Sequence, residues 1–407
     1  MGTSSGLSRV APRIGGRTDP FVESVIREMT RVAASVGAIN LSQGVPDFDP
    51  PPEVLEAAID ALRSGRNQYS FSFGSPEFRA AIAQKTARYN RIPCDPETDV
   101  TVTCGVSEAL ISALLALGEP GDEIIILEPW FEIYVPDCII AGITPRFVPM
   151  HEPDYTFELA QLRAACNKNT RFILVNTPHN PTGKVFTREE LSDIAALCQE
   201  QNLIAIVDEI YEHLYYDGNR HISLGSLPGM EDRTVTISGL GKSYSATGWR
   251  VGWAVAAAPL TARIRRVHDY LTVCAPHPFQ AAGVVALNLP DSYYEQMRAE
   301  FAVRRQILLD GLRAAGFKCA PPQGAYYVMA DFSAVPWDKA RHCRPGQRVD
   351  RAFAEFLARE VGVAAVPGSS FYQGGRLGES RLRFNFAKTD ETLREVARRL
   401  QRLSGGC

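Results

Sequence analysis

Short runs of apolar residues recur along the middle of the chain, with helical patterns between several of them. The runs cover residues 100–104, 123–127, 172–176, 203–208, 234–238 and 251–255. Thr187 and Glu190 have the spacing of a capping box, and Leu191, Ile194 and Cys198 follow at helical spacing. Apolar strands that alternate with helices are typical of a mostly parallel sheet covered on both faces, so the pattern predicts the α/β class.

The pattern changes toward the C-terminus. Helices are expected over residues 293–312, 350–361 and 389–403, a strand region over 321–327 and a solvated loop over 337–348. Together these elements predict a second, smaller α+β lobe.

The N-terminal part has weaker signals. Residues 1–19 are rich in Gly, Ser and Arg with little apolar periodicity, which predicts a flexible arm. A helix should begin with Ser75 as its cap and Pro76 in its first turn. The total of 407 residues exceeds one small core, which also favours two lobes.

Composition narrows the function classes. The net charge is −3 and charged residues make up 22%, which argues against binding to nucleic acid or to an anionic membrane. No apolar run has membrane-spanning length and no export signal opens the chain, so a cytoplasmic protein is expected. The 9 cysteines are scattered singly, which predicts reduced thiols, most of them filling core space, and indicates no metal site.

Candidate ligand-binding groups fall where predicted strands end, which is where open α/β sheets bind ligands. Gly105 turns a strand into a helix whose free amides, with the Ser107 hydroxyl, suit a phosphate, although a plain turn capped by Ser107 has the same pattern. Asn180 is bracketed by prolines that fix its backbone, as an aimed amide requires, and the alternative is a rigid turn.

Two further strand ends carry charge. Asp208 ends an apolar strand, and a buried carboxylate needs a cation or donor as its partner. Tyr211 could reach the same ligand, whereas Glu209 is interpreted as a helix cap. Lys242 and Arg250 place an amine and a guanidinium among small residues, which suits a Schiff base and an anionic tail on one ligand.

With these groups together, the chain resembles the fold type I, class I aminotransferases that use pyridoxal 5'-phosphate, from about residue 42 onward. The matching motifs are Asn67-Gln68-Tyr69, Asn180-Pro181-Thr182-Gly183, Asp208-Glu209-Ile210-Tyr211, residues 242–252 and Arg381-Leu382-Arg383-Phe384. The resemblance implies a mostly parallel seven-stranded sheet covered by helices and a smaller α+β C-terminal lobe. The expected division is an arm over 1–19, a segment of the small lobe over 20–48, a large cofactor-binding domain over 49–287 and a small domain over 288–407.

The resemblance also implies the catalytic residues. Lys242 matches the lysine that holds the cofactor as a Schiff base and later moves the substrate proton. Asp208 matches the carboxylate that keeps the pyridine nitrogen protonated, which preserves the electron sink. Asn180 and Tyr211 match the donors to the phenolic oxygen of the ring.

Other matching residues would hold the phosphate and the ring. The phosphate ligands implied are the amide of Val106, Ser107, Arg250 and, from the neighbouring subunit of a homodimer, Tyr69. Many relatives have Ser or Thr three residues before the lysine, where this chain has Gly239, so the Gly239 amide or Ser238 would make that contact. Phe131 matches the aromatic residue that stacks on the ring, although Trp130 is its neighbour.

The substrate class follows from the same likeness. Arg383 matches the guanidinium that binds the substrate α-carboxylate. Gly44 lies in the segment 43–48, which is similar to that of the kynurenine, glutamine and methionine aminotransferases, where this glycine lies near substrate. Large neutral or aromatic L-amino acids are therefore expected as donors to a 2-oxo acid, by a ping-pong mechanism. No arginine of a dicarboxylate site stands in residues 273–278, so aspartate is disfavoured.

Two other functions were weighed. The same cofactor can support β-elimination, C–S bond cleavage or an oxidase-like reaction, and the run from Thr247 to Arg250 favours transamination over these. A regulatory domain that senses a ligand without turnover would need a DNA-binding segment, and the N-terminal arm is too short for one.

Overall fold

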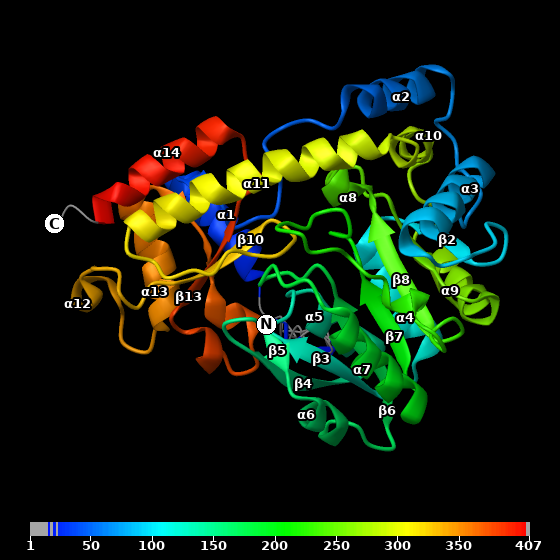
Figure 1. Ribbon diagram of the computed structural model, residues 1–407, viewed down its shortest axis with the longest axis horizontal. Helices are drawn as coiled ribbons and strands as arrows, with labels where there is room; N and C mark the ends of the chain where they lie inside the picture. The colour runs from blue at the N-terminus through cyan, green and yellow to red at the C-terminus, as the bar shows by residue number, and fades with distance from the viewer. Residues whose placement is uncertain (1–14, 17–18, 22, 404–407) are drawn as a thin grey trace, which may run out of the picture.

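The computed structural model describes residues 15–16, 19–21 and 23–403. The predicted arm over residues 1–19 therefore lies almost entirely outside the described residues. Two regions lie side by side along the long axis, a larger one around a central sheet and a smaller one that contains the C-terminal helices (Figure 1). Among the described residues, no helix combines the length and the apolar character needed to cross a membrane.

The larger region is built on one eight-stranded sheet with the order β2-β9-β8-β7-β6-β3-β4-β5. Its strands are β2 (Val100–Thr103), β3 (Glu123–Glu128), β4 (Thr144–His151), β5 (Thr156–Phe157), β6 (Thr170–Asn176), β7 (Ile204–Asp208), β8 (Thr234–Gly239) and β9 (Gly252–Val255). The neighbours from β8 to β4 pair in parallel, whereas β9 is antiparallel to β2 and β8. The mostly parallel sheet is thus confirmed, and the two-residue antiparallel β5 adds one strand to the expected seven.

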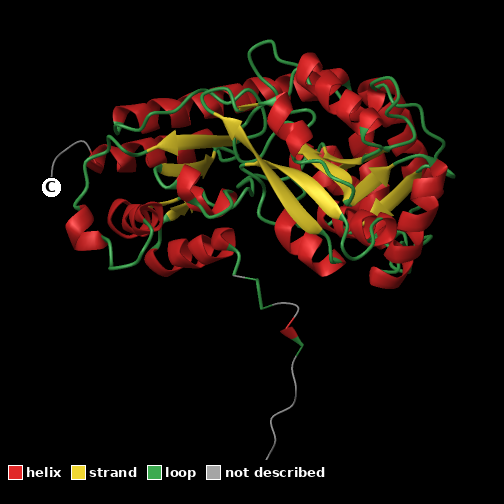
Figure 2. Cartoon of the chain, turned by 90° about the horizontal axis from the view of Figure 1, so that it is seen from below, coloured by secondary structure: helices red, strands yellow, loops and turns green. Residues whose placement is uncertain are grey.

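Alternation along the buried strands sends successive side chains to opposite faces of the sheet. Ile125, Ile173 and Val207 belong to one apolar cluster. Their neighbours Ile124 and Ile206 belong to another. The runs of β3, β6 and β7 therefore supply both cores, and helices lie on both sides of the sheet (Figure 2).

The helices of the larger region are α2 (Pro52–Arg63), α3 (Pro76–Lys85), α4 (Val106–Leu117), α5 (Tyr134–Ala141), α6 (Leu159–Ala164), α7 (Arg188–Glu200), α8 (Leu240–Ser243), α9 (Ala258–Leu271) and α10 (His277–Leu287). Two of them, α3 and α7, begin at the predicted positions. Ser75 accepts the amide of Phe78 at the start of α3, and Thr187 and Glu190 form the predicted capping box of α7.

The smaller region combines helices with short strands. It holds α11 (Asp291–Ala314), α12 (Lys339–His342), α13 (Val349–Phe356), α14 (Asp390–Leu400) and the strands β10 (Tyr327–Asp331), β11 (Val363–Ala364), β12 (Val366–Pro367) and β13 (Arg381–Asn385). From the N-terminal segment, α1 (Val25–Val36) leads to β1 (Ile39–Asn40), which pairs in parallel with β11. The N-terminal segment is therefore tied to the C-terminal part of the chain.

Two sequence predictions need correction. The strand expected over 321–327 begins only at Tyr327, because the preceding Pro- and Gly-rich residues form a loop. The loop expected over 337–348 contains α12, which Asp338 caps.

The described cysteines are free thiols, as predicted. Cys138 and Cys198 are buried in apolar clusters, and the partly buried Cys94, Cys104, Cys166 and Cys319 pack against such clusters.

Candidate active site

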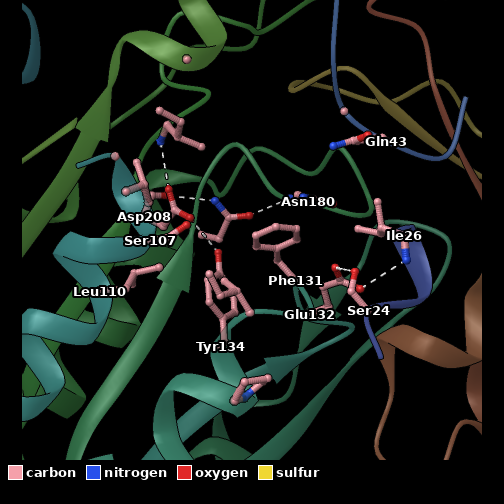
Figure 3. Close-up of a pocket in the computed structure, with 18 of the residues that line it drawn as sticks. Ser24, Ile26, Gln43, Ser107, Leu110, Phe131, Glu132, Tyr134, Asn180 and Asp208 are labelled. Carbon is pink, nitrogen blue, oxygen red and sulfur yellow. Dashed lines mark hydrogen bonds between the residues drawn. The ribbon is translucent and has the colours of Figure 1, made fainter. Parts of the chain in front are cut away.

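A cavity of about 860 Å³ lies at the C-terminal ends of the parallel strands, and we call it the strand-end cavity. Its lining comes from the segment before and within α1, from the loops after β2, β3 and β7, from the α8 region and from the smaller region. Figure 3 shows Ser107, Phe131, Tyr134, Asn180 and Asp208 gathered around it. The predicted residues that line it are Gly44, Val106, Ser107, Phe131, Asn180, Asp208, Tyr211, Lys242, Arg250 and Arg383.

Lys242 lies in α8, directly after β8, and its side chain points into the cavity. Its Nζ donates a hydrogen bond to the Gly44 carbonyl at 3.0 Å, and it makes no ion pair among the described residues. Burial lowers the pKa of this amine, while the nearby Asp208 acts in the opposite direction. The amine can thus lose its proton more easily than a surface lysine, as a nucleophile or base requires.

Asp208 is buried at the end of β7 with neutral partners only. Its carboxylate accepts from the Tyr134 hydroxyl at 2.9 Å and from the Ile210 amide at 3.1 Å (Figure 3). Burial raises the pKa of Asp208 to about 6, against the effect of these two hydrogen bonds. A protonated nitrogen beside this carboxylate would satisfy it.

Arg383 is fully buried in β13 and reaches the cavity from the smaller region. It donates to the Asn180 side-chain oxygen at 2.8 Å and to the Ser42 carbonyl at 2.5 Å, and its Nε has no partner among the described residues. Its guanidinium lies over the Tyr327 ring, 4.3 Å from the ring centre. This position suits the carboxylate of a small ligand.

The turn from β2 into α4 forms a cradle for an anion. Gly105 has a φ of 85°, and a Cβ there would stand 2.5 Å from Nη2 of Arg250. Val106 and Ser107 open α4, a helix of 12 residues whose first amides face the same place. The start of a helix, together with a guanidinium that lies next to a glycine without a side chain, can bind a phosphate group. The residues present therefore fit pyridoxal phosphate.

Three predicted residues do not line the cavity in this chain. Ser238 is turned away, because its hydroxyl donates to the Glu212 carboxylate at 2.6 Å on the other side of β8, and its neighbour Gly239 is also outside the lining. The direction of the Ser238 hydroxyl does not support a phosphate contact from Ser238, and the contact expected from Ser238 or the Gly239 amide stays a prediction. Tyr69 is 79% exposed and does not line the cavity, and its contact across a subunit interface also stays a prediction.

Aromatic residues line the cavity around Asp208. Phe131 lies edge-to-face with Tyr134, and its neighbour Trp130 stacks instead on Phe147, 4.4 Å between ring centres. This packing engages Trp130 with Phe147, which is consistent with the prediction that Phe131 is the residue that faces a ligand. The Tyr211 hydroxyl shares a hydrogen bond of 2.9 Å with that of Tyr327.

Sequence reasoning missed several contacts of the site. The sequence did not predict the hydrogen bond between Tyr134 and Asp208, because 74 positions separate these two residues. It also missed Glu132, which accepts a short hydrogen bond from Ser24 at the start of α1 (Figure 3). A further residue that it missed is Arg27, which lines the cavity. No local pattern marks these residues, because each acquires its role only from a partner distant in sequence.

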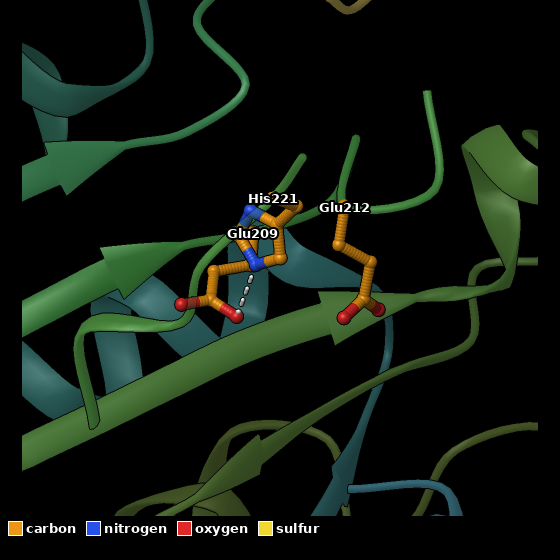
Figure 4. A group of neighbouring side chains, drawn as sticks. All are labelled: Glu209, Glu212 and His221. Carbon is orange, nitrogen blue, oxygen red and sulfur yellow. Dashed lines mark hydrogen bonds and ion pairs between the residues drawn. The ribbon is translucent and has the colours of Figure 1, made fainter. Parts of the chain in front are cut away.

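The interpretation of Glu209 as a helix cap is wrong. Glu209 is fully buried and accepts from Ser223, Asn90 and His221. With Glu212 and His221 it is the only group in the described part of the chain whose spacing would allow a metal ion (Figure 4). These carboxylates are already satisfied by an ammonium, hydroxyls and an amide, so we propose no metal there.

The fold and this site define a protein that binds a phosphate-bearing cofactor beside a reactive amine. The family described as aminotransferase class I and II matches residues 36–400. The structure of N-succinyldiaminopimelate aminotransferase from Mycobacterium tuberculosis superposes with a TM-score of 0.91 at 38% identity, covering 96% of this chain and 100% of that one.

Curated relatives agree. The kynurenine–oxoglutarate transaminase of Dictyostelium discoideum is 33% identical, over 95% of each chain. The methionine aminotransferase of Escherichia coli is 35% identical, over 93% of this chain and 96% of the relative. This chain belongs to the class I and II aminotransferases, and it is a transaminase that depends on pyridoxal phosphate. Nothing in these comparisons favours the β-elimination alternative.

Proposed function

We propose that the strand-end cavity carries out transamination between a large neutral or aromatic L-amino acid and a 2-oxo acid, by a ping-pong mechanism. The observation that carries this proposal is the pairing of the Lys242 amine with the ion-pair-free carboxylate of Asp208 in one cavity that also holds Arg383. When bound, pyridoxal phosphate supplies the electron-withdrawing ring that the reaction needs.

The proposed roles follow from the contacts. Asp208 would keep a proton on the ring nitrogen of a bound cofactor, because a buried carboxylate without a cation favours one beside it. Lys242 would hold the cofactor covalently and would move the proton at the substrate α-carbon. Asn180 and Tyr211 would donate to the phenolic oxygen, and Phe131 would pack on the ring.

The remaining ligands bind the charged ends. The Val106 amide, Ser107 and Arg250 bind the phosphate at the start of α4. Arg383 binds the substrate α-carboxylate, and Gly44 leaves room beside it, since a Cβ there would stand 2.0 Å from the Tyr327 hydroxyl.

The cavity wall supports the donor class. The lining includes the apolar and aromatic residues Phe21, Ile26, Val45 and Ile139. Such a wall favours a large neutral side chain, by about 25 cal/mol for each Å² of apolar surface buried.

A long side chain with a distal carboxylate is a second candidate, and Arg27 favours it. Arg27 lines the cavity from α1, and its guanidinium has no hydrogen bond or ion pair among the described residues. An unpaired guanidinium at a cavity wall suits a carboxylate. One of the relatives, from Mycobacterium tuberculosis, is named for a substrate that carries a succinyl group.

A donor screen separates the two candidates. Purified holoenzyme would be tested with neutral, aromatic and long acidic amino acids, with pyruvate and with 2-oxoglutarate as acceptors, and compared with Arg27→Gln. If neutral donors are preferred, kcat/KM for them should be nearly unchanged in Arg27→Gln. A selective loss of about tenfold or more for acidic donors would identify the second candidate. Arg63→Gln, an exposed position on α2, is the control.

We also propose a homodimer with shared sites. Tyr69 is 79%, Phe71 63% and Tyr270 90% exposed, and the Ser72 hydroxyl donates to Asp269 at 2.6 Å, which places these two segments together. An exposed aromatic patch of this kind supports a subunit interface. Light scattering should give twice the chain mass, and Tyr69→Phe should weaken cofactor retention. A fully active monomer would contradict the proposal.

The domain division and the location of the protein stay predictions. We propose that residues 20–48 move with the small domain over 288–407, and that residues 49–287 form the large domain. The pairing of β1 with β11 supports this division. A cytoplasmic location is proposed with it, and cell fractionation would test that.

A further inference from the structure

A second cavity, of about 610 Å³, lies beside the segment 213–223 that follows β7. Five arginines from four parts of the chain line it, and we call it the arginine pocket: Arg88, Arg91, Arg188, Arg220 and Arg298. None of its lining residues lines the strand-end cavity.

The positive charge of the arginine pocket is not neutralised by the chain. None of the five arginine side chains makes an ion pair or a hydrogen bond with a described residue, although Arg298 lies over the Tyr215 ring at 4.8 Å. Asp291 and Glu295 are the carboxylates in the lining. Lys85 also lines the pocket, but Glu212 already neutralises it at 2.5 Å. An excess of cations in a concave surface concentrates anions.

The wall of the pocket contains an imidazole without a partner. His213 is 3% exposed, and neither of its ring nitrogens has a hydrogen-bond partner among the described residues. Its ring is held between Tyr89 and Tyr294, with ring centres 4.1 Å away on each side. The Nδ1 of His221, also in the wall, has no partner within the described part of the chain either. These nitrogens are buried behind the pocket surface, so the groups that can meet a ligand are the arginines.

The buried imidazole adds no positive charge to the pocket. Burial holds the pKa of His213 well below its usual value, so its ring is neutral. The charge available to a ligand therefore comes from the arginine side chains. A cation is not favoured there, because guanidinium groups surround the opening.

We propose that the arginine pocket binds a small anion with two or more negative charges on oxygen, of the phosphate ester or polycarboxylate class. Guanidinium groups bind both classes through paired N–H donors, and the exposed arginines can adjust to either. The site is separate from the strand-end cavity and does not depend on the substrate assigned to that cavity.

Calorimetry on the holoenzyme tests this proposal with two probes, inorganic pyrophosphate and citrate. The variant Arg88→Gln/Arg220→Gln removes two exposed side chains without contacts, so folding and transamination should be unchanged. Arg263→Gln/Arg359→Gln removes two exposed arginines elsewhere and is the matched control. We expect saturable binding of at least one probe, weakened about tenfold or more only in Arg88→Gln/Arg220→Gln.

The outcomes decide between the two classes of anion. Tighter binding of pyrophosphate assigns a phosphate ester, and tighter binding of citrate assigns a polycarboxylate. No saturable binding of either probe, or equal binding by the variant and the control, would overturn the proposal. So would a loss that appears only in Arg27→Gln, because the probe would then occupy the strand-end cavity.

Discussion

Asp208 and Glu212 are two buried carboxylates four positions apart in the sequence, and their surroundings within the chain have opposite effects on their charge. Glu212 accepts from Lys85, Ser238 and Asn90, and its pKa is lowered to about 2 against the effect of burial. Asp208 accepts only from a hydroxyl and an amide, and burial raises its pKa to about 6. A buried charge that its own chain does not neutralise marks a ligand site.

The two lysines repeat this contrast. Lys85 is buried against Glu212, whereas the Lys242 amine donates only to a backbone carbonyl. The pair of Lys85 and Glu212 stabilises the fold behind β8, whereas the Lys242 amine faces a cavity that can take a cofactor. Charged groups without a charged partner therefore mark the candidate active site, and paired groups mark a structural polar core. The two kinds of group lie at the same strand ends.

Replacing Lys242 with Ala should have the largest effect. Turnover should fall by at least about 10⁴-fold, since general acid–base catalysis alone contributes about 10²–10⁴-fold and the covalent link is lost as well. Stopped-flow assays and the visible absorbance of the cofactor would measure this. The exposed Lys339→Ala is the control, and wild-type absorbance in Lys242→Ala would contradict the assignment.

Replacing Asp208 with Asn should reduce kcat by about 10²–10³-fold, as loss of one preorganised electrostatic group does. The variant should retain cofactor through the α4 cradle, because Gly105 and Arg250 are untouched. Single-turnover kinetics would measure the rate and equilibrium dialysis the binding. A wild-type rate would rule out the proposed role of Asp208.

Replacing Glu212 with Gln tests the structural side of the comparison. It leaves Lys85 buried without an anion, which should lower the free energy of unfolding by about 3–5 kcal/mol. The folded pKa of about 2 lies below the ordinary 4.5, so this stabilisation is present above pH 4.5 and is lost as pH falls toward 2. Chemical unfolding at several pH values would show a flatter profile in the variant, and an unchanged profile would contradict it.

Asp137 should show the smallest effect, with the opposite dependence on pH. Burial raises its pKa from 3.8 to about 7, and one of its oxygens has no partner among the described residues. Stability should therefore fall as pH rises from about 4 to 7. Asp137→Asn should remove this fall and stabilise the protein by about 1–3 kcal/mol at pH 8. Unfolding at pH 5 and pH 8 measures it, and an equal change at both would refute the assignment.

The predicted elements and chemical groups were found largely where sequence signals are local. The apolar runs became β2, β3, β6, β7, β8 and β9, and the caps at Ser75 and Thr187 opened helices. Ten candidate residues line the strand-end cavity, because the carboxyl ends of parallel strands meet at one edge. Glu209 is not the predicted cap because its side chain joins a buried polar cluster, and the Ser238 hydroxyl donates to the same cluster.

The amino-acid sequence by itself determined which segments become strands and helices and which reactive side chains stand at their ends, because apolar period, caps and turn residues act over a few positions. Only the tertiary structure decided which charges are neutralised. Tyr134 meets Asp208 and Lys85 meets Glu212 across long stretches of chain. Such pairings depend on how strands and helices stack, and burial then decides whether a charge is satisfied within the chain or requires a ligand.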